Sequence, residues 1–221
     1  MRKNKMMRAA SALMVAVLLT TCTISGTFAK YVTTAEGSDT ARVAKWGVVV
    51  EAENFDLFTD KYETDDTSFT GAYSVESSGS DKVLAPGTSG SFADIAITGT
   101  PEVAVDVKIE ATVELSDNWI VDGDFYCPVV VTVGTTAISG LDYEDADDFV
   151  EAIEKALEDK SAQYAPNFDL STVYDNTNLD LAWAWAFENG HDKEDTKLGD
   201  KAVAEDLTIS IGVKITVEQI D

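Results

Sequence analysis

The chain offers few side chains of the kinds that perform catalysis. It has one histidine, His191, and two cysteines, Cys22 and Cys127. A hydrolytic zinc site generally takes three protein ligands, often two or more of them histidines, and a serine triad needs a histidine beside its nucleophile. No Gly-x-Ser-x-Gly, His-Glu-x-x-His or glycine-rich phosphate loop occurs. The sequence therefore predicts no catalytic residue and no metal ligand, and it disfavours an enzyme.

Acidic side chains are abundant but do not single out a site. The chain carries 40 Asp and Glu residues against 16 Lys and Arg residues, for a formal net charge of −24. A glycosidase carboxylate pair could be drawn from so many acids, yet no motif selects one, so a secreted hydrolase ranks last among the functions considered. Such a surface repels phosphate backbones and anionic membranes, so we expect no nucleic-acid partner.

One acidic segment, Glu188–Asp200, could offer oxygen ligands to calcium near Asp192 and Asp195. Its spacing differs from that of an EF-hand loop, in which ligands alternate around a central glycine. The favoured interpretation is a solvated connection between two strands, with asparagine, glycine and aspartate forming the turns. No cofactor other than this weakly supported calcium ion is expected.

Two tryptophans, Trp183 and Trp185, stand two residues apart and share one face of a predicted strand. An exposed aromatic pair of this kind could serve as a platform for stacking glycans. Leu179, Leu181 and Phe187 extend the same face, and a five-residue apolar row is more simply explained as part of the core. Both interpretations stay open from the sequence, with the core favoured.

The N-terminus has the three parts of a secretory signal, predicted over residues 1–29. Met1–Arg8 carries four basic residues and no acid, Ala12–Leu19 is an unbroken apolar run, and small residues precede Lys30. The apolar run is shorter than the roughly 20 residues of a membrane-spanning helix, so we expect cleavage after Ala29 and no stable membrane anchor. The mature protein would then be secreted, extracellular or on the cell surface, with signal peptidase as its partner during export.

Residues 30–43 form a predicted N-terminal arm that precedes a single domain, 44–221. Lys30, Tyr31, Val32, Thr33 and Thr34 follow the expected cleavage site and are β-prone, and Gly37-Ser-Asp39 ends the segment. Cleavage would give this arm a free end. Such an arm can add to an exposed sheet edge of another subunit, but it could equally fray or pair within its own subunit.

Period-two alternation of apolar and polar residues is the main structural signal in the mature chain. It predicts long antiparallel strands at Val103–Leu115 and Leu207–Val217, each with one dry and one wet face. Turn residues bound the shorter predicted strands. These are Trp46–Ala52, Gly71–Glu76, Ser91–Thr98, Pro128–Val133 and Leu179–Glu188.

One stretch, about residues 145–160, has helical periodicity instead. Phe149, Ile153, Ala156 and Leu157 recur at spacings of three and four, and acids crowd the first turn. The fold prediction is mainly β: an antiparallel, jelly-roll-like β-sandwich with one inserted amphipathic helix. Cys127, beside Pro128 at the head of an apolar run, is predicted to be a buried small hydrophobic residue.

Three segments resemble the TasA/camelysin group of secreted proteins from Gram-positive bacteria. They are the signal and its junction through Gly26–Gly47, the Leu84-Ala-Pro-Gly87 turn with the strands that follow, and Trp183–Gly199. The resemblance implies processing by a SipW-type signal peptidase and a jelly-roll subunit of biofilm-matrix fibres, in which an N-terminal segment can complete the sheet of the next subunit. Camelysin has been classed as a metallopeptidase, but the chain lacks a histidine cluster, so no protease site is carried over.

The leading hypothesis is therefore a non-enzymatic structural protein that assembles with copies of itself into an extracellular fibre or biofilm matrix by β-strand addition. The alternative is an extracellular glycan-binding β-sandwich module that uses the tryptophan strand. The two differ in what they require of Trp183 and Trp185, because only the binding module needs these side chains exposed.

Overall fold

The computed structural model describes residues 41–51, 56–64, 68, 70–93, 95–175 and 178–220. The chain divides into two units, Met1–Val43 and Ala44–Asp221, and the account below concerns the second. The predicted signal, 1–29, and the arm residues Lys30–Thr34 lie outside the described residues.

Two long strands form the first sheet. β6 (Val105–Leu115) and β13 (Ile209–Gln219) pair antiparallel along their whole length, and β11 (Ala162–Tyr164) pairs with the start of β6. Residues opposite one another in an antiparallel pair share a face, so the apolar alternation of both strands falls on the same side. Their polar faces carry Glu110 and Lys214, which form an exposed cross-strand ion pair at 2.6 Å.

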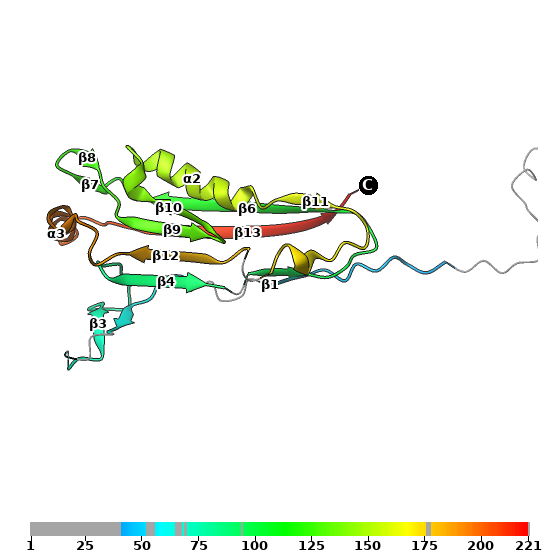
Figure 1. Cartoon of the computed structure of the whole chain (residues 1–221), viewed down its shortest axis with the longest axis horizontal. Helices are drawn as coiled ribbons and strands as arrows, with labels where there is room; N and C mark the ends of the chain where they lie inside the picture. The colour runs from blue at the N-terminus through cyan, green and yellow to red at the C-terminus, as the bar shows by residue number, and fades with distance from the viewer. Residues whose placement is uncertain are drawn as a thin grey trace, which may run out of the picture. The chain divides into compact units, whose positions relative to one another are not determined.

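The second sheet has the order β10–β9–β12–β4 (Figure 1). β9 (Val129–Val133) lies between β10 (Thr136–Ser139) and β12 (Leu181–Trp185), and β4 (Thr88–Phe92) pairs with the other side of β12. The short strands make three further antiparallel pairs. These are β1 (Val49–Glu51) with β5 (Ala96–Thr98), β2 (Lys61–Glu63) with β3 (Tyr73–Glu76), and β7 (Ile120–Val121) with β8 (Asp124–Phe125).

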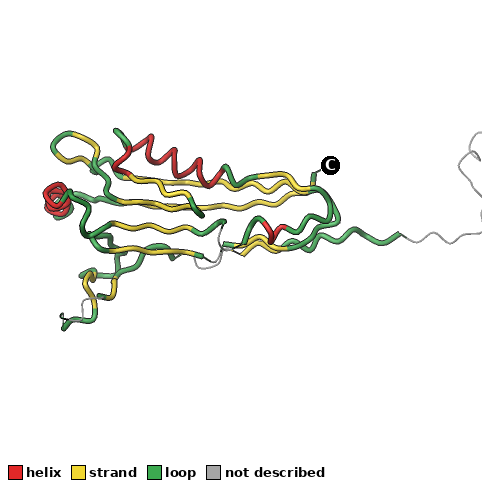
Figure 2. The backbone as a smooth tube through the Cα atoms, viewed as in Figure 1, coloured by secondary structure: helices red, strands yellow, loops and turns green. Residues whose placement is uncertain are grey.

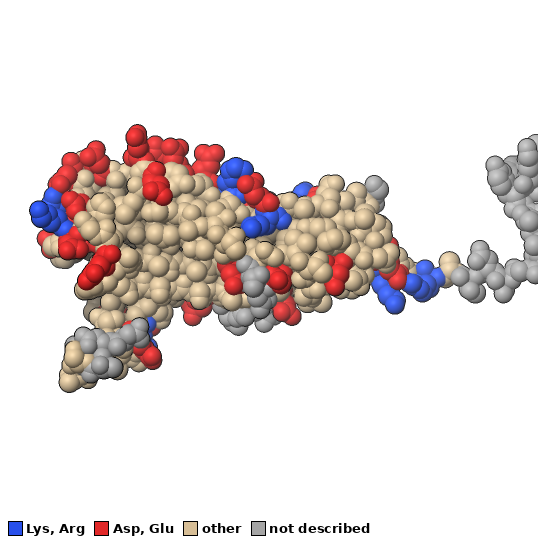
Figure 3. All heavy atoms as spheres, viewed as in Figure 1, with Lys and Arg blue, Asp and Glu red and all other residues tan. Residues whose placement is uncertain are grey.

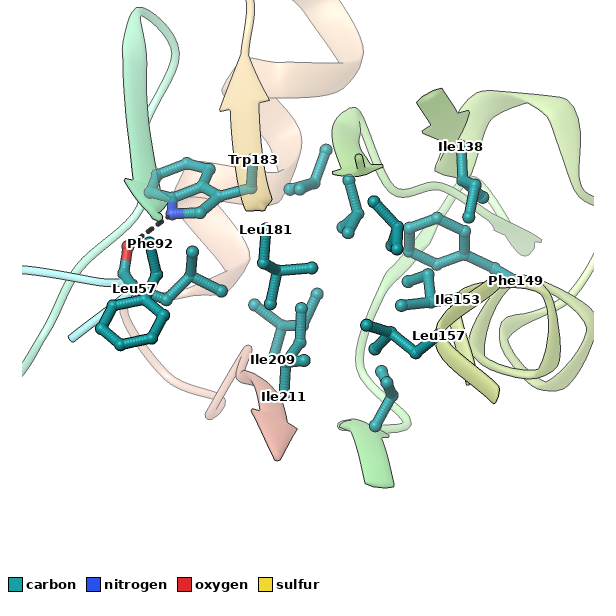
Figure 4. Close-up of a cluster of buried hydrophobic side chains, with 14 of the residues drawn as sticks. Leu57, Phe92, Ile138, Phe149, Ile153, Leu157, Leu181, Trp183, Ile209 and Ile211 are labelled. Atoms are coloured by element: carbon teal, nitrogen blue, oxygen red, sulfur yellow. Dashed lines mark hydrogen bonds between the residues drawn. The ribbon is translucent and has the colours of Figure 1, made fainter. Parts of the chain in front are cut away.

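One hydrophobic core joins the two large sheets. Leu181 from β12 lies near Ile209 and Ile211 from β13, and all three are buried (Figure 4). The same cluster includes Phe149 and Ile153, which are fully buried. Two facing sheets with a helix along one side therefore enclose the apolar residues, as in a β-sandwich.

The predicted helix is confirmed as α2 (Ala146–Glu158). The Asp145 side chain caps it by accepting a hydrogen bond from the Asp148 N–H at 2.8 Å, and such a cap satisfies one of the free N–H groups of the first turn. Phe149, Ile153 and Leu157 form its buried stripe. The helix runs alongside β6, with its long axis roughly parallel to the strands (Figure 2).

A second α-helix corrects the prediction for the acidic segment. Residues expected to form a solvated connection instead make α3 (Asp192–Lys201), preceded by His191 at the N-cap position. Acids at the helix start, Asp192, Glu194 and Asp195, suit the positive end of the helix dipole. Leu198 is buried against the core and holds the helix in place despite its polar composition. Two 3₁₀ turns, η2 (Gly140–Asp142) and η3 (Leu170–Thr172), complete the described helical elements.

The antiparallel, mainly β prediction is confirmed, with β6 and β13 close to their expected limits. The predicted strand Ser91–Thr98 is wrong in one respect, because β4 ends at Phe92 and β5 begins only at Ala96. The jelly-roll connectivity is not confirmed by this strand order. Among the helices of the described residues, none is long and apolar enough to cross a membrane.

Candidate strand-acceptor site

The hydrogen bonds on the α2 side of β6 reveal which way the backbone groups of β13 point. The Val113 N–H donates to Glu154 Oε1 of α2 at 2.9 Å, and the Ile109 N–H donates to Ser161 Oγ at 2.9 Å. Both groups therefore point away from β13. Val113 lies opposite Ile211 and Ile109 lies opposite Ile215.

Directly opposite residues of an antiparallel pair turn their N–H and C=O groups either both inward or both outward. Ile211 and Ile215 therefore direct these groups away from β6, and the strict alternation of the ladder extends this to Ile209, Val213 and Val217. Within the described part of the chain, no strand pairs with this side of β13. We call this row of backbone groups the β13 edge.

A groove borders the start of the β13 edge. It has a volume of about 310 Å³, and the residues from Leu207 to Ile211 form one wall. Leu57, Phe58, Lys82 and Leu84 form the other wall. The lining is mostly apolar and includes the first residues of β13, so an extended segment placed here could bury side chains while it pairs with β13.

The far half of β13 is also incompletely covered. Ile209 and Ile211 are buried, whereas Val213, Ile215 and Val217, which share their face, are only partly buried. Apolar side chains on the core face of a sandwich normally become buried between the sheets. Among the described residues, the core-face side chains in the second half of β13 are therefore less completely covered than Ile209 and Ile211.

The outer wall of the groove is fixed by one buried tryptophan. Trp183 Nε1 donates to the Leu57 carbonyl oxygen at 2.9 Å, a hydrogen bond drawn in Figure 4. Gly90 of β4 allows this approach, because a Cβ at that position would lie 2.3 Å from the Leu57 oxygen and 2.7 Å from Trp183 Nε1. Glycine at position 90 is therefore required for the wall to sit where it does.

The turn from Ala85 to Thr88, which follows the groove residue Leu84, is held by hydrogen bonds within the turn. Thr88 Oγ1 donates to the Ala85 carbonyl at 2.7 Å, and it accepts a hydrogen bond from the Ala85 N–H at 3.1 Å. Gly87 has a φ of 85°, a conformation that favours glycine. This confirms the turn predicted at Pro86-Gly87. The Tyr62 hydroxyl donates to the Val83 carbonyl at 2.9 Å and fixes the approach to it.

A second cavity of about 280 Å³ adjoins the groove, since Lys82, Leu84 and Leu207 line both. Trp119 and Trp185 contribute edges of their buried indoles to its wall, and Leu198 of α3 closes another side. The groove thus ends in an aromatic-lined cavity beside α3. A large apolar side chain would fit this lining better than a charged one.

Asp195 lies in the wall of this second cavity and is buried. Its Oδ1 accepts a hydrogen bond from the Tyr126 hydroxyl, and its Oδ2 accepts from Asn189 Nδ2 at 3.0 Å and Trp185 Nε1 at 3.3 Å. Burial, and then the bond to Asp195, raise the pKa of Tyr126, so its hydroxyl stays protonated and remains a donor. The cluster ties the start of α3 to β12 and to the segment between β8 and β9.

Of the two predicted calcium ligands, Asp195 belongs to this cluster, whereas Asp192 is exposed at the start of α3. Asp192 and Asp195 stand in the first turn of α3, and both carboxylate oxygens of Asp195 already accept hydrogen bonds from protein groups. The described residues contain no group of three or more His, Cys, Asp or Glu side chains placed to hold a metal ion. We therefore do not carry the calcium ion into the functional proposal.

Trp183 and Trp185 are core residues, as the favoured sequence interpretation held. They are 1% and 5% exposed and pack against Phe58 and Trp119 respectively. Phe187, predicted to extend the same row, is instead 73% exposed beyond the end of β12. The tryptophan pair therefore presents no stacking face at the surface.

Cys127 is fully buried, as predicted. Burial raises the pKa of its thiol to about 12, so the thiol is un-ionised at neutral pH. Because the thiolate is the reactive form, this cysteine acts as a packing residue.

Sequence reasoning gave the arm as one candidate donor strand but did not indicate the residues that would receive it. Leu57, Phe58 and Leu84 lie in segments without clear periodicity, so only their apolar character marked them. The long alternation of Leu207–Val217 gave the strand, but which neighbour pairs with it, and on which side, is a tertiary property. The outcome for Lys30–Thr34 itself lies outside the described residues.

Comparison with known proteins gave no match: no family model, no curated protein and no solved structure is detectably similar to this chain.

Proposed function

We propose that this chain is a secreted, non-enzymatic structural protein, whose copies assemble into an extracellular fibre or matrix by adding a strand from one copy to the β13 edge of the next. The observation that carries the proposal is the β13 edge itself, with outward backbone groups beside an apolar groove. An exposed, unpaired edge strand is a template for pairing with another chain.

The proposed occupant is the segment Lys30–Thr34 of a second copy. It is short and β-prone, and signal cleavage after Ala29 would give it a free end. Alternate side chains of an added strand point to one face, so either Tyr31 and Thr33 or Val32 and Thr34 would enter the groove. The resemblance of the signal junction to the TasA/camelysin group agrees with this assignment.

The net charge sets the conditions for assembly. Removal of residues 1–29 takes away four basic residues and no acid, so a net charge of −24 becomes −28. Acidic side chains gather over α2 and around α3 (Figure 3). Like-charged copies within a Debye length of roughly 8 Å repel one another at physiological salt, so higher ionic strength or acidification should favour growth.

The direct test compares the mature protein, residues 30–221, with a version that starts at Ala41. Both should fold, because β6, β13 and α2 hold the core without the arm, but only the longer protein should form filaments in electron microscopy. Roughly five backbone hydrogen bonds at a net 0.5–1.5 kcal/mol each would shift assembly by orders of magnitude. Excess peptide Lys30–Glu36 should cap growth, and the same peptide with Val32→Pro is the matched control.

Equal filament growth by the shortened protein would refute strand donation by the arm. No filaments or oligomers from the mature protein under any salt or pH condition would refute the structural function as a whole. The alternative of a glycan-binding module gains no support from the described surface, since both tryptophans it needed are buried.

A further inference from the structure

The exposed large apolar side chains of the second unit gather at its two opposite ends. At one end are Trp46, Val49 and Val50, which are 41%, 49% and 39% exposed. At the other are Ile120, Phe187 and Val203, which are 42%, 73% and 87% exposed. The one further exposed large apolar residue of the described part of this unit is Leu141 in η2.

Hydrogen bonds place these groups at the two ends of β13. The first group adjoins its C-terminal end, because the Glu102 N–H donates to the Lys45 carbonyl and the Ile220 N–H donates to the Ala104 carbonyl, each at 2.9 Å. The second group adjoins its N-terminal end, because Trp119 Nε1 donates to the Thr208 carbonyl at 3.1 Å. An eleven-residue strand at roughly 3.3 Å per residue separates the ends by roughly 35 Å.

Figure 1 agrees, with β1 in the half of the unit that holds the C-terminal end of β13 and α3 with β7 and β8 at the opposite end. Lys201 Nζ donates to the Ile120 carbonyl at 3.3 Å, and Val203 follows α3 directly, so these two residues share the α3 end. Phe187 lies against Gly87, whose N–H donates to the Trp185 carbonyl at 2.8 Å. Trp185 in turn contacts Asp195 of α3.

We propose that these two surfaces are the halves of one head-to-tail contact between copies of this chain. The β1-end surface (Trp46, Val49, Val50) of one copy packs against the α3-end surface (Ile120, Phe187, Val203) of the next. Two different patches at opposite ends of a subunit make a heterologous contact, which does not form a two-fold dimer and continues into an open filament where successive rotations do not close a ring. The inference rests on the proposed function in taking the partner to be a second copy.

The position of the arm supports this choice of partner. The predicted arm, 30–43, joins the second unit at Ala44, two residues before Trp46. If Lys30–Thr34 fills the groove of another copy, the nine linking residues 35–43 span at most roughly 30 Å. That copy is then held close to the β1 end, and its groove begins at Leu207, next to its own α3 end. The arm and the two apolar surfaces thus meet in one continuous contact.

Charge does not select the pairing, because both ends carry both signs. At the β1 end, exposed Lys45 lies beside Glu102, whose carboxylate accepts from the Lys45 N–H at 2.9 Å. At the α3 end, Asp192 and Glu194 begin the helix and Lys201 lies beside Ile120. In this proposal the arm sets the orientation and apolar burial supplies the affinity.

The test uses two variants of the mature protein that each add one surface cysteine, Val49→Cys and Val203→Cys, with a short bismaleimide crosslinker. Cys127 is buried and un-ionised, so it does not compete. Mixing the two variants should give a crosslinked dimer at a yield at least roughly tenfold above that of either variant alone. A self-crosslink of Val49→Cys equal to the mixed yield would overturn the head-to-tail assignment.

A second measurement separates failure of this contact from failure of the proposed function. Phe187→Ser with Val203→Ser should weaken filament growth at least roughly tenfold, whereas binding of labelled Lys30–Glu36 peptide should stay unchanged. Filaments that form normally from this double variant, or from a mixture that shows no crosslink, would overturn the end-to-end contact and leave strand addition standing. Absence of any filament or peptide binding in the unmutated protein would overturn both.

Discussion

The outer edges of the paired strands β6 and β13 differ in how their backbone groups are satisfied. On the α2 side, β11 covers the start of β6, Ser161 takes the N–H of Ile109, and Glu154 takes the N–H of Val113. On the other side, the described residues supply no strand for the β13 edge, and a groove of about 310 Å³ borders it. One edge is closed by its own chain, and the other is suited to closure by another chain.

The unpaired β13 edge does not mean that β13 is poorly held in the fold. The two strands are paired with each other over eleven residues, and their apolar faces belong to one core. The helix inserted between β10 and β11, together with Ser161 and β11, closes the first edge, and no strand pairs with the other side of β13 in the described chain. The asymmetry is what the proposed strand addition would use.

The largest expected effect comes from truncating a buried side chain of α2, the helix that lies along β6. Phe149→Ala deletes a fully buried ring at the start of α2 and should lower the free energy of unfolding by about 3–5 kcal/mol. Urea denaturation followed by circular dichroism measures this loss. Leu141→Ala, an exposed apolar residue near the same helix in sequence, is the control and should change stability by less than about 0.5 kcal/mol. A loss below about 1 kcal/mol for Phe149→Ala would mean that α2 does not hold this edge.

Proline substitutions distinguish the N–H groups of β13 that point toward β6 from those that point away from it. Gly212→Pro removes an N–H that points toward β6 and should destabilise the protein by about 1–3 kcal/mol. Val213→Pro removes an outward N–H, so beyond the effect of Val213→Ala it should cost little stability yet block strand addition. Gly212→Ala is a suitable control, because a Cβ there would lie 3.6 Å from the nearest atom. Equal losses for both prolines in thermal unfolding would contradict the deduced register.

The long strands and the helix α2 could be predicted from the sequence, whereas the residues that surround the β13 edge could not. The strict alternation of Val103–Leu115 and Leu207–Val217 reflects a local rule, that successive side chains of a strand face opposite sides, and it located β6 and β13 well. α3 was missed because its ten residues are mostly polar, and only the burial of Leu198 and the bonds to Asp195 reveal why it is helical. Long-range contacts of this kind leave no local pattern.

A smaller effect is expected from the hydrogen bond between the Val113 N–H and Glu154, which satisfies one backbone group on the α2 side of β6. Glu154→Ala leaves the Val113 N–H without its acceptor in a half-buried position and should cost about 1 kcal/mol. Glu154→Gln keeps an acceptor oxygen at the same place and should recover most of that loss. Chemical denaturation of the two variants makes the comparison. Equal stability of Glu154→Ala and the unmutated protein would show that solvent serves this N–H equally well.

The smallest effect concerns the exposed ion pair that crosses the two edge strands. The hydrogen bond from Lys214 lowers the pKa of Glu110 below its ordinary value. A lowered pKa means that the folded state favours the carboxylate, so this stabilisation is present above the ordinary pKa of the carboxyl and disappears as pH falls through the lowered value. Glu110→Gln should therefore be slightly less stable at pH 7 and indistinguishable at pH 2, as measured by thermal unfolding. A difference that grows on acidification would contradict the pairing.

Amide hydrogen exchange along β13 tests the central claim most directly. In the protein that starts at Ala41, the outward amides of Ile211, Val213, Ile215 and Val217 should exchange fast, while the intervening Gly212, Lys214 and Thr216 amides stay protected. Addition of saturating Lys30–Glu36 peptide should then protect the outward set selectively. Uniform protection along β13 without the peptide, or no change in the outward amides when it is bound, would contradict the account.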